Sequence, residues 1–156
     1  LIISPISTVA IAMAIQVNGL AAGAAAMGVA ATTLVLVVNS WKVNKPGVTI
    51  AIALGAMKMM MPNLFRRPII LVPCFFTAII SAVPVALMSI SGSPASGGFG
   101  LVGLVGPLAS IEKGLGVVAA LLAWLVIPVI ASLVGQFLFE KVFKLYDRKD
   151  VFEFLG

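Results

Sequence analysis

Four long apolar stretches, separated by short islands of charge, constrain this chain more than any other feature. Residues 1–17, 20–38, 69–90 and 116–139 contain no charged side chain. A helix that crosses the hydrocarbon core of a bilayer needs about 20 predominantly apolar residues. The chain is 62% hydrophobic and only 10% charged, whereas soluble domains carry about 25% charged residues. The pattern therefore predicts an integral membrane protein.

The second apolar stretch is built largely from small side chains. Nine of the 19 residues in 20–38 are Ala or Gly. Small residues let neighbouring helix backbones approach closely inside a membrane, while they present little side chain to lipid. We therefore expect this helix to lie inside a helix bundle.

Two further segments are too short or too interrupted to cross the membrane comfortably. Residues 48–61 contain Lys58, and residues 91–111 are rich in Gly and are broken by Pro107. Such segments suit re-entrant hairpins, which are tolerated where protein or water surrounds them. The predicted fold is an all-α, polytopic membrane helix bundle with about four spanning helices and two re-entrant hairpins. We expect residues 1–139 to form its transmembrane domain and residues 140–156 to form a cytoplasmic or interfacial amphipathic tail.

The basic residues are distributed unevenly along this topology. If residues 48–61 enter and leave on one side, eight cations fall on that face: Lys42, Lys45, Arg66, Arg67, Lys141, Lys144, Arg148 and Lys149. Lys113 falls on the other face. The positive-inside rule then makes the first face cytoplasmic. This rule also accounts for the net charge of +5, and the chain has no patch of the kind that binds nucleic acid.

A candidate solute-binding segment follows the third apolar stretch. Gly-rich, non-helical backbone there would expose N–H and C=O groups, and Ser hydroxyls suit a sugar or polyol. The proposed substrate-binding residues are Ser93, Pro94, Ser96, Gly97 and Gly98, helped by Lys58 and Asn63. An ordinary external loop fits the same composition. Lys58 could equally reach the membrane surface from a short hairpin.

Several chemistries have no candidates in this sequence. It contains no His, and no Asp or Glu lies within an apolar stretch, so a carboxylate proton relay has no residues to use. The single cysteine, Cys74, lies in an apolar stretch and is expected to be a packing residue. We find no nucleophile paired with a base. The sequence thus predicts no catalytic residue, no metal site and no cofactor.

Two segments carry a family resemblance. Residues 39–63 (NSWKVNKPGVTIAIALGAMKMMMPN) and 91–108 (SGSPASGGFGLVGLVGPL) resemble bacterial membrane proteins of the phosphotransferase-system enzyme IIC-like group, also described as toxin regulators of the PfoR type. The resemblance covers the whole chain, as the C-terminal half of a longer protein. It implies a homodimeric sugar permease of the bacterial plasma membrane, which works with a cytoplasmic IIB-type phosphocarrier.

The chain differs from other IIC families in its polar residues. Those families use His and Glu near the sugar, whereas this chain has no His and no Glu within an apolar stretch. Three functions therefore remain open. The first is a permease subunit that binds and translocates a sugar or polyol and relies on a separate IIB partner for phosphoryl transfer. The second is a membrane sensor that regulates gene expression without transport. The third is a secondary transporter, which the absence of acidic coupling residues disfavours.

Overall fold

The computed structural model describes residues 7–155, and between these residues it is helical with no β-strand. Three helices are long and apolar enough to cross a membrane: Gly19–Ser40, Pro68–Leu87 and Val117–Val142. The predicted all-α membrane helix bundle is confirmed. The first apolar stretch contains α1 (Thr8–Ala14), and its residues 1–6 lie outside the described part. The predicted number of four spans is therefore not tested.

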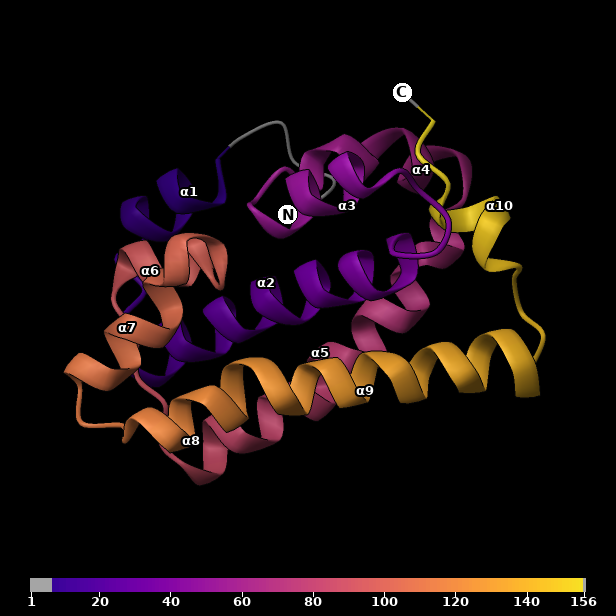
Figure 1. Cartoon of the computed structure of the whole chain (residues 1–156). Helices are drawn as coiled ribbons and strands as arrows, with labels where there is room; N and C mark the ends of the chain where they lie inside the picture. Colours follow the sequence, from indigo (N-terminus) through magenta and orange to yellow (C-terminus); the bar gives the residue numbers. More distant parts are fainter. Residues whose placement is uncertain (1–6, 156) are drawn as a thin grey trace.

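Helix α2 (Gly19–Ser40) lies at the centre of the molecule. Figure 1 shows it between α5 (Leu71–Leu87) and α9 (Ile127–Gln136) on one side and the short helices on the other. Ala22, Ala26, Ala30 and Ala31 are completely buried. The interior position predicted from the small residues is confirmed. The buried face could not be chosen from the sequence, since Ala25 is exposed and a side chain at Gly28 would meet open space.

The first predicted hairpin folds as short helices joined by a turn. Helix α3 (Pro46–Ala53) ends before Gly55, whose φ of 117° suits glycine, and the 3₁₀ turn Met57–Met60 leads into α4 (Met61–Arg66). Thr33 Oγ1 of α2 lies 2.9 Å from Met57 Sδ, a contact that holds the hairpin against the central helix. Re-entry of this hairpin from one side of a membrane stays a prediction.

The second predicted hairpin consists of α6 (Pro94–Phe99) and α7 (Val105–Glu112). The turn between them has positive φ at Gly100, Gly103 and Leu104. The backbone N–H of Gly106 donates to Gly100 O at 2.8 Å across this turn. Residues 94–99 are helical, so the expectation of a non-helical segment there is wrong. Pro94 at the first helical turn and a capping Ser93 favour a helix start, and these signals outweigh the glycines.

The last long helix changes its winding next to its proline. It begins with α8 (Val117–Leu121), passes through the π-helical turn Leu122–Val126, and continues as α9, in which Pro128 lies. Proline lacks an N–H and crowds the carbonyl four residues earlier, and a π-helical turn relieves this crowding. A second π-helical turn, Phe137–Val142, ends the helix. The helix therefore runs past residue 139, where we expected the transmembrane part to end.

One end of the molecule collects the connectors and the C-terminal tail. In Figure 1 the C-terminal ends of α2 and α9 lie beside α4 and α10 (Arg148–Phe152), opposite α6 and α7. The side chains of Asn44, between α2 and α3, and of Asn63, in α4, both donate to carbonyls of residues 151–153. The eight cations of the predicted cytoplasmic face thus belong to segments that meet at one end. Lys113 follows α7 at the other end.

Candidate solute-binding cavity

A cavity of about 340 Å³ lies where the tips of the two hairpins meet α1. Hairpin one (α3 to α4, residues 46–66) contributes residues 55–58, and hairpin two (α6 to α7, residues 94–112) contributes Gly98, Phe99 and Val102. Helix α1 contributes Thr8 and Val9. Gly55 touches hairpin two directly, because a Cβ built on it would lie 2.8 Å from Val102 Cγ1. Ligand pockets of about 300–1,000 Å³ are typical for small molecules. The volume fits a compact solute.

Among the described residues that line this cavity, Lys58 has the only ionisable side chain. Its side chain is exposed and has no hydrogen-bond or ion-pair partner among residues 7–155. An ammonium group offers three hydrogen-bond donors, which suit hydroxyl or carboxylate oxygens of a solute. The remaining walls are mainly apolar, with Thr8 adding a hydroxyl that donates to Gly98 O at 3.2 Å.

Gly97 and Gly98 bring α6 close to its neighbours. A Cβ on Gly98 would overlap the backbone of Val9 in α1, and a Cβ on Gly97 would contact Ala22 of α2 at 3.6 Å. Both glycines are buried. Gly98 therefore forms a wall of the cavity and also permits the close packing of α6 on α1.

The hydroxyl groups of Ser93 and Ser96 serve the start of α6. Ser93 Oγ accepts from the backbone N–H of Ser96 at 3.3 Å, while Ser96 Oγ accepts from the N–H of Ser93 at 2.8 Å. This reciprocal arrangement is a capping box with Ser in place of the usual Glu or Gln. Ser93, Pro94, Ser96 and Gly97 do not line the cavity, and they position the helix that does.

Asn63 lies at the other end of hairpin one, in an anchor for the C-terminal tail. It is fully buried, and its Nδ2 donates to Val151 O at 2.9 Å and to Glu153 O at 2.6 Å. Asn44 strengthens the anchor by donating to Phe152 O at 2.7 Å and accepting from Phe154 N–H at 2.7 Å. Asn63 does not line the cavity.

The tail that these asparagines hold is part of the core. Phe152 is fully buried, and its ring lies 5.8 Å from that of Tyr146. Burial raises the pKa of the Tyr146 phenol. An interfacial or cytoplasmic tail was expected from the charges, and its docking between hairpin one and α2 was not foreseen.

Sequence reasoning missed several lining residues of the cavity. Thr8, Gly55, Phe99 and Val102 carry no chemical motif, and only the fold brings them together. The expected absence of metal ligands stays a prediction, although no group of three or more His, Cys, Asp or Glu gathers between residues 7 and 155.

The fold defines a helical membrane protein with a small cavity between its two hairpin tips. The model of the family described as "Phosphotransferase system, EIIC" matches residues 1–152. The chain therefore belongs to the EIIC family of the phosphotransferase system. No curated protein and no solved structure matches this sequence. Family membership and the membrane-length helices support a permease-type role, and the narrower PfoR-type assignment stays a prediction.

Proposed function

We propose that the protein binds a sugar or polyol in the cavity between the two hairpin tips and translocates it across the bacterial plasma membrane. The observation that carries the proposal is the cavity itself, because Lys58 of hairpin one and Gly98 of hairpin two both line it. These were two of the positions selected from the sequence. The hydroxyl-rich face of the solute would meet Lys58 and Thr8, and its C–H face would meet Val102 and Phe99.

The other selected positions support the cavity indirectly in this proposal. Ser93, Pro94, Ser96 and Gly97 hold α6 in place, and Asn63 fixes the base of hairpin one. We also propose, from the family, that a cytoplasmic IIB-type phosphocarrier phosphorylates the solute and that the permease is a homodimer. The basic end of the molecule would face that partner.

Uptake by intact cells tests the proposal. A deletion strain is complemented with the full-length protein and supplied with radiolabelled hexoses, pentoses and hexitols. We expect phosphoenolpyruvate-dependent uptake of at least one compound. Val102→Trp, which places a large ring in the cavity, should lower this uptake on the order of tenfold. Val83→Trp is the matched control, because Val83 is exposed on α5 and lies outside the cavity.

Two outcomes contradict the proposal. Equal uptake by the Val102→Trp and Val83→Trp proteins removes the cavity from the transport pathway. A purified protein that binds a panel sugar while the complemented strain takes up none of them supports the sensor function instead.

A further inference from the structure

A second cavity opens between α2 and α9, next to the docked tail. Its volume is about 340 Å³, and eight residues line it: Val37, Val38, Trp41, Lys42, Val129, Leu133, Gln136 and Arg148. The two helices run in the same direction (Figure 1). The valines and the leucine precede the polar residues on both helices, so one end of the groove is apolar and the other is polar. The polar end of the groove lies at the end of the molecule where the segments with the eight cations meet, beside α4 and α10.

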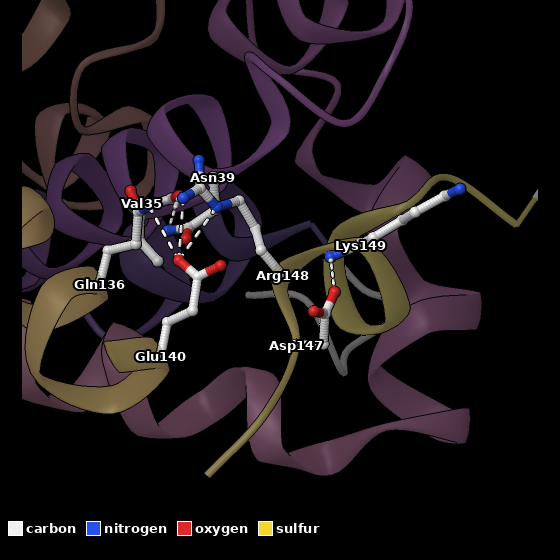
Figure 2. Close-up of polar contacts among 7 residues, drawn as sticks. All are labelled: Val35, Asn39, Gln136, Glu140, Asp147, Arg148 and Lys149. Atoms are coloured by element: carbon white, nitrogen blue, oxygen red, sulfur yellow. Dashed lines mark hydrogen bonds and ion pairs between the residues drawn. The ribbon is translucent and has the colours of Figure 1, made fainter. Parts of the chain in front are cut away.

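Arg148 is held at the polar end by a specific ion pair. Its Nη2 and Nε donate to Glu140 Oε2 at 2.8 and 3.3 Å, and Gln136 Nε2 donates to the same oxygen at 3.1 Å. Figure 2 shows the guanidinium of Arg148 reaching toward Gln136 and Glu140. A guanidinium has five N–H donors, and three remain after these two bonds.

Lys42 makes the polar end cationic overall. Glu140 balances Arg148, while Lys42 is exposed and has no ion-pair partner within the described residues. Trp41 lies beside it with 70% of its surface exposed. Tryptophan at this position is typical of the boundary between headgroups and hydrocarbon. The groove thus offers positive charge, an interfacial aromatic ring and an apolar channel in that order.

We propose that this groove binds one anionic phospholipid. The phosphate lies between Lys42 and Arg148, and an acyl chain lies along Val37, Val129 and Leu133. The seven helical steps from Val129 to Gln136 give a channel of about 10 Å at 1.5 Å per residue, enough for the first part of an acyl chain. Basic pockets between membrane helices are established sites for anionic headgroups.

Other occupants fit the groove less well. A sugar would leave the apolar end unfilled, because Val37, Val38, Val129 and Leu133 offer no hydrogen bonds from their side chains. A second copy in the same orientation would bring two basic ends together. The positive charge at Lys42 instead complements the negative charge of a phosphatidylglycerol headgroup.

Quenching of Trp41 fluorescence tests the proposal. The full-length protein is reconstituted into phosphatidylcholine vesicles that contain increasing fractions of brominated phosphatidylglycerol or brominated phosphatidylcholine. We expect half-maximal quenching at about fivefold lower fraction for phosphatidylglycerol, the effect of one lysine near the surface. Trp41→Phe should abolish this preference, since the other tryptophan, Trp124, is buried.

Two lysine variants separate a built site from general surface attraction. Lys42→Gln should raise the half-quenching fraction of phosphatidylglycerol about fivefold. Lys149→Gln is the matched control, because it removes the same charge at the same end. Lys149 does not line the groove, and its ammonium points away from Glu140 in Figure 2. Lys149→Gln should leave the half-quenching fraction of phosphatidylglycerol nearly unchanged.

Three results overturn the proposal. The first is equal quenching by the two brominated lipids, and the second is an equal effect of Lys42→Gln and Lys149→Gln. The third is efficient disulfide formation between copies through Leu133→Cys, which places a second protein chain in the groove. Native Trp124 emission in each variant shows that it has folded.

Discussion

The close approach of α2 to the segment before α6 leaves no room for a side chain at Gly23. A Cβ on Gly23 would overlap the carbonyl oxygen of Ile90. Backbone bonds from Gly19 N–H to Gly92 O (3.2 Å) and from Gly92 N–H to Gly19 O (2.9 Å) hold the same segment. Because the overlap involves backbone atoms, a change of rotamer cannot relieve it.

Gly23→Ala should destabilise the protein by about 1–5 kcal/mol. Overpacking costs about 1–3 kcal/mol, and loss of the two backbone bonds adds about 1–3 kcal/mol. The gain from replacing glycine by alanine within a helix offsets about 1 kcal/mol of this cost. Gly28→Ala is the matched control, because a Cβ at Gly28 would contact no atom within 4 Å. Only the gain applies there, so this variant should be slightly stabilised.

Thermal unfolding in detergent measures both variants. A change of 1 kcal/mol shifts the melting temperature by about 2–4 °C in a chain of this size. Gly23→Ala should therefore melt at least about 2 °C below the parent, and Gly28→Ala at or above it. A Gly23→Ala protein as stable as Gly28→Ala would refute the close packing of α2 against Ile90.

Three further predictions concern the bundle and its tail. Ala26→Leu should cost about 1–3 kcal/mol of stability by overpacking the buried face of α2. Ala25→Leu on the exposed face should leave the melting temperature nearly unchanged, and equal shifts of the melting temperature in the two variants would contradict the position of α2. Asn63→Ala removes two hydrogen bonds to the tail and should cost about 1–3 kcal/mol, seen as faster limited proteolysis after residue 146, while Asn18→Ala at an exposed site should not accelerate it. Tyr146 is the single tyrosine, and its raised pKa means that tail docking keeps its full stability below about pH 10 and loses it as the pH rises further. An ultraviolet titration should show this phenol ionising later than free tyrosine, and ionisation at the ordinary pKa would argue against its burial.

The positions of the long helices could be predicted because length and absence of charge decide membrane helices almost alone. The two interrupted segments could also be recognised, since residues 48–61 are too short to span and contain Lys58. Which face of α2 is buried could not be predicted, because Ala and Gly occur all around this helix. Ala25, Ala26 and Gly28 are all small residues, so the sequence does not separate them, whereas in the structure only Ala26 of the three is buried.

Some residues of the candidate site could likewise be identified from the sequence, and others could not. Lys58 and Gly98 could be selected because a membrane-depth cation and a glycine cluster are both uncommon, and the structure brings them to one cavity. Ser93 and Ser96 were selected for their hydroxyls, but the same hydroxyls can cap a helix, and local spacing alone does not separate the two uses. The added side chain in Gly98→Val would clash with the backbone of Val9. Loss of solute binding in that variant would therefore not by itself indicate a contact between Gly98 and the solute.

Protection of an introduced cysteine tests the cavity most directly. The native background is favourable, because the single cysteine, Cys74, is buried. Maleimide labelling of Val102→Cys is compared with labelling of Leu104→Cys, which is exposed two residues away and outside the cavity. We expect at least one hexose, pentose or hexitol to slow labelling at position 102 and to leave position 104 unchanged. Labelling at position 102 that no compound of this panel slows would contradict the assignment of this cavity as the solute site.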